Sequence, residues 1–229
     1  MGSMSAIPVE FLHGLGQSPS DWDATIASLP EWLDPATTTI PSFSAPAHKP
    51  FSLNEAARWV LADVADRSEE PAVLVGLSLG SQVAIRAASL EPGLVSGLIL
   101  SAPLARPPKA MLKIQRAMMG MLPERAVAGR PIEEGGSGLT KEDILAVLDT
   151  FTDFDLRPEL YQIQVPTLVV VGGNDRLNRK SSGEVVESMR DATLQVIPGA
   201  GHEWNRTHPE QFAGVVTNWI RATFGDAVS

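Results

Sequence analysis

The sequence predicts an α/β fold in which a mostly parallel sheet of about six strands has helices on both faces. Three observations predict this class. Short apolar runs rich in β-branched residues alternate along the chain with amphipathic stretches of helical spacing. Polar residues are rare within these runs, which is typical of strands buried on both faces of a parallel sheet. Clusters of Gly, Pro and small polar residues separate the runs, as expected of short connections between strands and helices.

Composition sets bounds on this fold and on its partners. A chain of 229 residues is long enough for one α/β domain with a sizeable core. The net charge of −9 argues against nucleic acid and anionic membranes as partners. The absence of cysteine excludes a disulfide scaffold, a thiol nucleophile and a thiolate metal site. Because the sequence has neither a signal-peptide pattern nor a membrane-spanning run, we expect a cytoplasmic protein.

In the first half of the chain, capping signals mark where helices begin between the apolar runs. Ser18-Pro19 supplies an N-cap and a first helical position, and Ser52-x-x-Glu55 is a capping box. A further helix follows Ser78 directly. Residues 41–50 are Pro-rich, and we expect them to be irregular. Strands are predicted at residues 7–12, 37–40, 73–77 and 94–100.

The alternation lapses in the second half of the chain and then resumes. Residues 104–164, called the insert below, contain a Met-rich amphipathic stretch and a predicted helix near residues 141–150. We expect the insert to form a small helical lid on a core made of residues 4–103 and 165–229. Residues 1–3, before Met4, look like a cloning remnant. Beyond the insert we predict strands at 165–171 and 193–197, with helices that begin at the capping box Ser181-x-x-Glu184 and at His208-Pro209.

Residues 76–80 have the pattern G-x-S-x-G, between a predicted buried strand and an amphipathic helix. A serine on so sharp a turn is held in a strained conformation with its hydroxyl exposed above the sheet. The flanking Gly76 and Gly80 are needed because a side chain there would collide with the strand or the helix. The helix N-terminus offers free N–H groups and the positive end of a dipole to a developing negative charge. This context favours Ser78 as a nucleophile.

A serine nucleophile needs a base that takes its proton and a third group that orients the base. Asp175 and His202 could supply these parts, since each follows a predicted strand, as Ser78 does. The carboxyl ends of parallel strands lie at one edge of a sheet, so we expect the three side chains to converge. Asp175 has alternatives, because its loop is also an ordinary turn and because Asp153 and Asp155 of the insert are rival acids.

Four features in this order resemble the α/β-hydrolase superfamily. They are the glycine loop at residues 13–16, the turn at 76–80, Gly173-Asn174-Asp175 after a Val-rich strand, and the loop at 199–202. The resemblance extends over nearly the whole chain outside the insert. We do not expect the antiparallel strands that often precede the first strand in this superfamily, which leaves about six strands.

The resemblance implies a catalytic triad and an oxyanion hole. Ser78 would be the nucleophile, His202 the general base and then acid, and Asp175 the orienting carboxylate. The backbone N–H groups of Leu15 and Leu79 would form the oxyanion hole. The leading hypothesis is therefore a serine hydrolase that cleaves a carboxylic ester, a lactone or a thioester through an acyl-enzyme.

The expected substrate is a small, largely apolar molecule, because the insert is apolar and the chain has no basic cluster. The methionines of the insert either form an adaptable apolar wall over the site or are plain core packing. The glycine-loop histidine, His13, either contacts substrate or braces its own loop. No His, Asp or Glu cluster has the spacing of a metal site, so neither a metal nor a cofactor is expected. Candidate substrate-binding residues are His13, Met118, Met119, Met121 and Phe154.

Residues 76–84 also resemble those of enol-lactonases and of carbon–carbon bond hydrolases that act on ring-cleavage products. Those enzymes handle carboxylate-bearing substrates and usually place an arginine over the pocket. Arg106, Arg116 and Arg157 are the candidates for it here. Two further alternatives use the same residues: a perhydrolase, and an inactive relative that only binds a small molecule.

Overall fold

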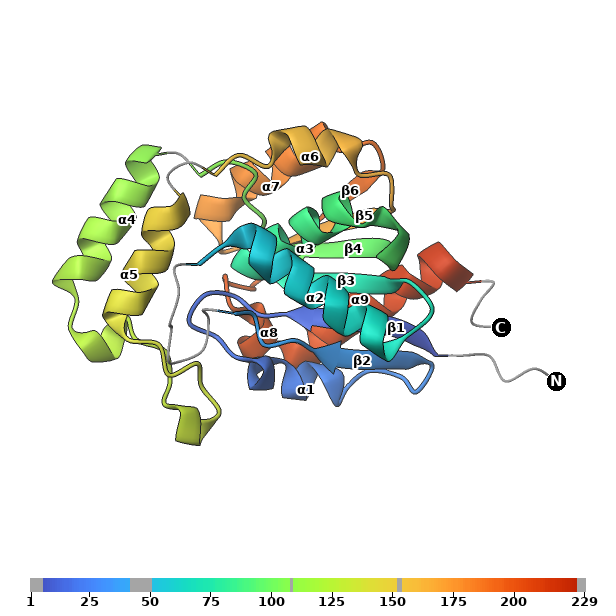
Figure 1. Cartoon of the computed structure of the whole chain (residues 1–229), viewed down its shortest axis with the longest axis horizontal. Helices are drawn as coiled ribbons and strands as arrows, with labels where there is room; N and C mark the ends of the chain where they lie inside the picture. The colour runs from blue at the N-terminus through green and yellow to red at the C-terminus, as the bar shows by residue number, and fades with distance from the viewer. Residues whose placement is uncertain (1–5, 42–50, 108, 152–153, 226–229) are drawn as a thin grey trace.

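The computed structural model describes residues 6–41, 51–107, 109–151 and 154–225. A six-stranded sheet forms its centre, with the order β2-β1-β3-β4-β5-β6 and parallel pairing between all neighbours (Figure 1). The predicted α/β class is therefore confirmed, with about six strands as expected. The strands are β1 (Ile7–Leu12), β2 (Leu33–Thr37), β3 (Ala72–Leu77), β4 (Val95–Ser101), β5 (Thr167–Gly172) and β6 (Ala192–Ile197).

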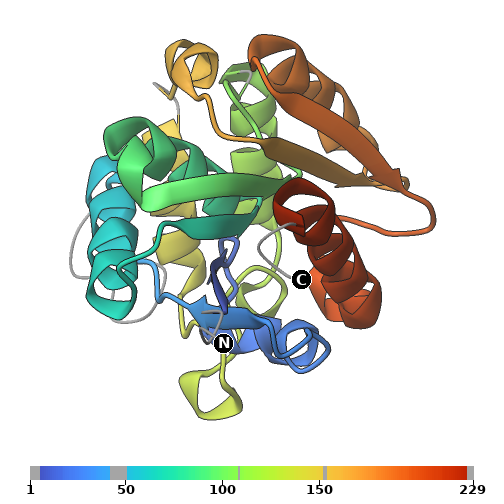
Figure 2. The ribbon, with the colours of Figure 1, turned by 90° about the vertical axis from the view of Figure 1, so that its right-hand side faces the viewer.

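Helices cover both faces of the sheet, as Figures 1 and 2 show from two sides. On one face, α2 (Leu53–Arg67), α3 (Leu79–Leu90), α6 (Arg157–Gln162) and α7 (Arg176–Ser188) bury apolar residues against the sheet. On the other face, this is done by η1 (Pro19–Trp22), α8 (Trp204–Thr207) and α9 (Pro209–Phe224). The short elements α1 (Asp23–Ile26) and η2 (Pro92–Leu94) complete this part of the molecule.

The strands are buried on both sides, as their continuous apolar runs predicted. In β3, Leu74 belongs to the core under α2 and α3, whereas Val73 and Val75 belong to the core under α9. All three side chains are inaccessible to solvent. Each such side chain contributes about 1.5–3 kcal/mol by leaving water. The sheet is thus a rigid base for the loops at its edge.

The insert lies between β4 and β5 and is helical. Its elements α4 (Lys109–Met121) and α5 (Lys141–Thr150) pack against each other beyond the edge of the sheet (Figure 1). The predicted helix at 141–150 matches α5, whose N-cap Thr140 accepts a hydrogen bond from Asp143 N–H. Two single-turn elements, η3 (Glu124–Ala126) and η4 (Ile132–Glu134), lie between α4 and α5.

The second strand differs from its prediction. The run at residues 37–40 was expected because of its β-branched residues, but β2 ends at Thr37 and begins at Leu33. It contains Pro35, which an edge strand tolerates because its N–H side needs no partner. Of the Pro-rich segment predicted to be irregular, residues 42–50 lie outside the described part of the chain, as do residues 1–3.

The seventh helix also begins earlier than predicted. Ser181 and Glu184 were expected to form its capping box, but both lie inside α7. The N-cap is Asp175, whose carboxylate accepts a hydrogen bond from Asn178 N–H. The loop residue singled out for chemistry thus also starts a helix.

One charged side chain, Glu10, lies inside the sheet on β1. Its carboxylate accepts hydrogen bonds from Thr38 at 2.7 Å and from Arg67 of α2 at 2.5 Å. Burial raises the pKa of Glu10 to about 7, although these two partners act against the increase. Thr38 Oγ1 also lies 2.6 Å from a carboxylate oxygen of Asp63. The hydroxyl can donate to only one carboxylate at a time, so the two carboxylates compete for it.

Candidate active site

Ser78 stands on a strained turn between β3 and α3. Its backbone has φ 52° and ψ −114°, which non-glycine residues rarely adopt. A Cβ on Gly76 would lie 2.5 Å from backbone atoms of Gly80 and Ser81. A Cβ on Gly80 would lie 2.1 Å from the carbonyl oxygen of Leu12. Both glycines are therefore required by the close approach of strand and helix, as the sequence pattern indicated.

Hydrogen bonds to the neighbouring strand hold this turn in place. Ser78 N–H donates to the carbonyl of Ser101, at the end of β4, over 2.8 Å. Ser81 Oγ lies 2.8 Å from the carbonyl oxygen of Gly76 and 3.0 Å from that of Ser101. Ser101 Oγ in turn accepts a hydrogen bond from the buried indole of Trp204. The strained conformation is thus fixed by contacts on three elements.

Asp175 and His202 meet at the same edge of the sheet, from the loops after β5 and β6. The Nδ1 of His202 lies 2.7 Å from Oδ2 of Asp175. An ionised carboxylate only accepts hydrogen bonds, so the imidazole carries its proton on Nδ1 and leaves Nε2 free to accept one. The Asp175 side chain is 6% exposed and that of His202 40%. The carboxylate is thus buried, whereas the imidazole is partly exposed to solvent.

Asn178, on the first turn of α7, was missed by the sequence analysis. Its Nδ2 lies 2.8 Å from both carboxylate oxygens of Asp175. Burial raises the pKa of Asp175, but hydrogen bonds from His202 and Asn178 outweigh burial and hold that pKa below its usual value. The carboxylate therefore stays ionised and keeps one orientation. The available signal was the spacing, since a residue three positions after an N-cap lies beside it.

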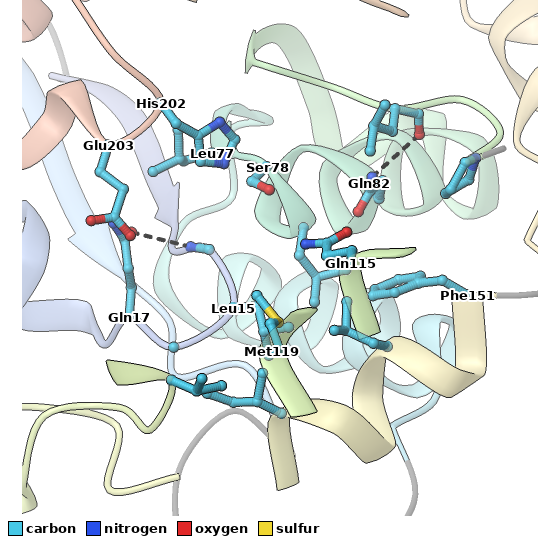
Figure 3. Close-up of a pocket in the computed structure, with 18 of the residues that line it drawn as sticks. Leu15, Gln17, Leu77, Ser78, Gln82, Gln115, Met119, Phe151, His202 and Glu203 are labelled. Atoms are coloured by element: carbon cyan, nitrogen blue, oxygen red, sulfur yellow. Dashed lines mark hydrogen bonds between the residues drawn. The ribbon is translucent and has the colours of Figure 1, made fainter. Parts of the chain in front are cut away.

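Ser78 and His202 line the same cavity, and Figure 3 shows the imidazole beside the serine. Within the described ranges, no hydrogen bond joins the two side chains. The serine hydroxyl turns about one single bond, and catalytic hydrogen bonds in unliganded enzymes often tighten only when substrate binds. The Ser78–His202 hydrogen bond stays a prediction.

Two backbone N–H groups are available beside Ser78. Leu79 is the first residue of α3, where a helix leaves its N–H groups without intrahelical partners. Leu15 lies in the loop after β1, and β1 pairs directly with β3. Neither N–H donates a hydrogen bond in the part of the chain that is described, and both residues line the cavity. The oxyanion hole itself stays a prediction.

The glycine loop that carries Leu15 is braced from below. Gln17 N–H donates to the carbonyl of Gly14, and Gln17 Oε1 accepts a hydrogen bond from Gly14 N–H. The Gln17 amide also exchanges two 3.3 Å hydrogen bonds with the amide of Asn205 on α8. His13 Nε2 accepts a hydrogen bond from Ile40 N–H, so Nδ1 carries the proton and faces the carbonyl of Gly14. Burial lowers the pKa of His13 to about 4, which keeps the ring neutral.

His13 is therefore a bracing residue, and its prediction as a substrate-binding residue is wrong. Its side chain is fully buried and it is not among the residues that line the cavity. The alternative in which it braces the glycine loop accounts for its contacts.

The cavity has a volume of about 410 Å³ and lies between the edge of the sheet and the insert (Figure 3). Of the predicted pocket residues, Met119 lies in its wall. Met118 and Met121 are 62% and 87% exposed on the outside of α4, so their prediction is wrong. Phe154 is also corrected, because it packs edge-on against Phe151 and only Phe151 reaches the cavity. The apolar wall consists largely of Leu15, Leu112, Met119, Ile144, Leu148 and Phe151.

The three arginines proposed to bind a substrate carboxylate lie outside the cavity. Arg106, Arg116 and Arg157 do not line the cavity, and they pair with Asp155 or Asp149 at the surface. Asp155, a rival for the orienting acid, is occupied by these pairs, and the pKa of its carboxyl is lowered to about 2, chiefly by the hydrogen bond from Arg157. The other rival, residue 153, lies outside the described chain.

Two other arginines do line the cavity, and the sequence analysis missed them. Arg130 of the insert and Arg206 of α8 both bind Oδ1 of the buried Asp21, at 2.8 and 2.7 Å. Burial raises the pKa of Asp21, but the hydrogen bonds from Arg206 and Ser18 and the two charges keep it below its usual value. We call this trio the Asp21 latch, because it joins the insert to the core.

Two kinds of feature are absent from the described residues. No group of three or more His, Asp or Glu side chains among them could hold a metal ion. None of their helices is long and apolar enough to cross a membrane.

Comparisons with known proteins agree with this geometry. Residues 11–215 match the model of the alpha/beta hydrolase family. The chain is 24% identical to a pimeloyl-(acyl-carrier protein) methyl ester esterase of Neisseria meningitidis serogroup A, over 95% of this chain and 78% of that protein. It is 29% identical to the enzyme of that name from a Shewanella species, over 68% and 70% of the two chains.

Solved structures share the fold at lower identity. An enol-lactonase from Burkholderia xenovorans LB400 superposes with a TM-score of 0.79 at 18% identity, over 94% of this chain and 92% of that one. A thermophilic esterase from Thermogutta terrifontis superposes with a TM-score of 0.76 at 21% identity, over 96% and 92%.

Proposed function

The chain belongs to the alpha/beta hydrolase family, and we propose that it is a serine hydrolase that cleaves a carboxylic ester through an acyl-enzyme. The observation that carries the proposal is the 2.7 Å contact between His202 Nδ1 and Asp175, at the mouth of a cavity that also exposes Ser78. The contact assigns the tautomer in which Nε2 is the free base. A strained serine, an oriented imidazole and two free N–H groups are the parts of acyl transfer.

In the proposed reaction, Ser78 Oγ attacks the ester carbonyl carbon while His202 Nε2 takes the hydroxyl proton. The carbonyl oxygen becomes an oxyanion and accepts hydrogen bonds from the N–H groups of Leu15 and Leu79. The bond to the alcohol oxygen then breaks, and His202 gives its proton to that oxygen. Water repeats the two steps on the acyl-enzyme and releases the acid and Ser78.

The proposed substrate is a small-molecule ester with a largely apolar acyl part. This is supported by the apolar wall that the insert contributes and by the esterase names of the relatives in Neisseria and Shewanella. A lactone or a thioester would pass through the same acyl-enzyme.

A second candidate is an enol-lactonase or carbon–carbon bond hydrolase acting on carboxylate-bearing substrates. One specific observation favours it, since Arg130 and Arg206 line the cavity. Against it, both guanidinium groups are already bound to Asp21. Parallel assays with neutral aryl esters and with a vinylogous keto-acid would separate the two candidates.

The proposal is tested with 4-nitrophenyl esters of increasing acyl length. We expect kcat/KM to increase with chain length until the cavity is full and then to fall. We expect Ser78→Ala to lower turnover by about 10³ or more with unchanged folding. If the wild-type protein cleaved no ester faster than Ser78→Ala does, the proposed function would be rejected.

A further inference from the structure

Two glutamine side chains interrupt the apolar wall of the cavity. Gln82 belongs to α3, and Gln115 extends from α4 across the cavity toward it (Figure 3). Gln82 is only 3% exposed. Neither residue takes part in the proposed acyl transfer, so their presence in an apolar wall needs another explanation.

The Gln82 amide has one fixed orientation. Its Nε2 donates a hydrogen bond to the carbonyl oxygen of Leu104 over 3.3 Å. A backbone carbonyl can only accept, so Nε2 must point to Leu104 and Oε1 must point into the cavity. Figure 3 shows this orientation. Among the residues described, nothing donates to Oε1. Because Oε1 faces the cavity, water hydrates it in the free protein, and a ligand that displaces this water loses affinity unless it supplies a donor itself.

Gln82 also lies at a defined place relative to the nucleophile. It follows Ser78 by four residues and lies in the first turn of α3, the helix whose N-cap is Ser78. Figure 3 shows Gln82 and Gln115 on the side of Ser78 away from His202. The leaving alcohol must lie next to His202, since His202 protonates it. The acyl group therefore lies on the glutamine side.

We propose that Gln82 and Gln115 bind a hydroxyl group on the acyl chain of the substrate, at the second or third carbon. A hydroxyl both donates and accepts. It would donate to Gln82 Oε1 and accept from the Gln115 amide, which has no hydrogen bond in the described structure. The position near the carbonyl follows because Gln82 lies in the first turn of the helix that begins directly after Ser78. The inferred substrate class is a hydroxyacyl ester, and this inference rests on the proposed function.

The test compares 4-nitrophenyl butanoate with the two enantiomers of 4-nitrophenyl 3-hydroxybutanoate. Each rate is divided by the rate of spontaneous hydrolysis, which removes the inductive effect of the hydroxyl. We expect the wild-type kcat/KM for one enantiomer to exceed that for butanoate by about tenfold, the effect of one buried hydrogen bond. In Gln82→Met this ratio should fall to within about twofold of one. In Gln115→Met it should fall part of the way.

The ratio separates recognition from a general defect, because a loosened fold slows both esters alike. Met119→Leu, in the same wall, is the matched control and should leave the ratio unchanged. If Gln82→Met did not fold, the ratio in the wild type and the ratio in Gln115→Met would still test the inference. Equal wild-type rates for all three esters, or a preference that survives Gln82→Met, would overturn the inference. Failure of the proposed function would look different, since wild type would then match Ser78→Ala on butanoate.

Discussion

The edge of the sheet and the insert face each other across one cavity, and they are built in opposite ways. At the edge, a Cβ on Gly80 would lie 2.1 Å from the carbonyl oxygen of Leu12. The buried carboxylate of Asp175 accepts hydrogen bonds from Asn178 and His202. On the insert, α4 leaves Met121 87% exposed, and the Arg116–Asp149 pair is half in solvent. The comparison teaches that the groups proposed for chemistry are held by close packing and hydrogen bonds, whereas the insert buries only its inner side and leaves its outer face in solvent.

The largest expected effect is on Asp175, the acid of the rigid edge. Asp175→Asn keeps the shape but favours the wrong imidazole tautomer, so we expect turnover to fall by about 10³–10⁴. Asn178→Ala leaves the carboxylate and removes one partner, so we expect about a tenfold loss. Steady-state kinetics on one aryl ester would measure both. Near wild-type turnover in Asp175→Asn would mean that another carboxylate orients His202.

The next largest effect is expected on folding stability, when each of two glycines is replaced by alanine. Gly80→Ala forces a methyl group into the carbonyl of Leu12, and we expect at least about 3 kcal/mol of lost stability or no folded protein. Gly183→Ala on α7 is the matched control, because a Cβ there meets nothing within 4 Å. We expect it to stabilise by up to about 1 kcal/mol through helix propensity. Equal unfolding free energies for the two variants would contradict the rigid packing of the turn.

The Asp21 latch joins the two regions and should have an intermediate effect. Asp21→Asn keeps the size but removes the carboxylate that Arg130 and Arg206 share, although Arg206 keeps its ion pair with Glu203. We expect a cost of about 1–2 kcal/mol, because both arginines are partly exposed. The folded pKa of Asp21 lies below its unfolded value. The contribution is therefore complete above about pH 4 and is lost as the pH falls further. Denaturant unfolding at several pH values checks this, and equal acid sensitivity of wild type and variant would refute it.

Glu10, inside the sheet, should show the opposite dependence on pH. Its folded pKa is raised to about 7, so the folded state binds the extra proton and stability falls as the pH rises from about 4.5 to 7. The loss is at most about 3 kcal/mol. We expect Glu10→Gln to flatten the unfolding free energy over this range. An unchanged slope in the variant would show that Glu10 is ionised when folded.

The smallest effect belongs to the outer face of the insert. Met121→Gln should change the free energy of unfolding and the activation free energy of the reaction each by less than about 0.5 kcal/mol, since the side chain is largely in solvent. Met119 lies two residues earlier, in the cavity wall. Met119→Gln should lower kcat/KM for esters with long acyl chains and leave kcat/KM for the acetate ester unchanged. Similar chain-length profiles for the two variants would remove Met119 from the wall.

The same contrast explains what could be predicted from the sequence. That Ser78, Asp175 and His202 lie at one edge of the sheet could be predicted because each follows a strand, and parallel strands carry their carboxyl ends to one edge. Of the three methionines predicted to line the pocket, the structure places only Met119 there, because helical spacing does not say which apolar face of α4 meets α5 and the cavity. Asp21, Arg130 and Arg206 were missed because their contacts join residues more than a hundred positions apart.

The most direct test of the central claim is labelling with a fluorophosphonate, followed by mass spectrometry of the labelled peptide. Such a probe reacts with a serine only when a base and an oxyanion hole activate it. The account predicts one adduct, on Ser78, with labelling slowed strongly in His202→Ala although that variant stays folded. Absence of label from the folded wild-type protein, or equal labelling of His202→Ala, would contradict it.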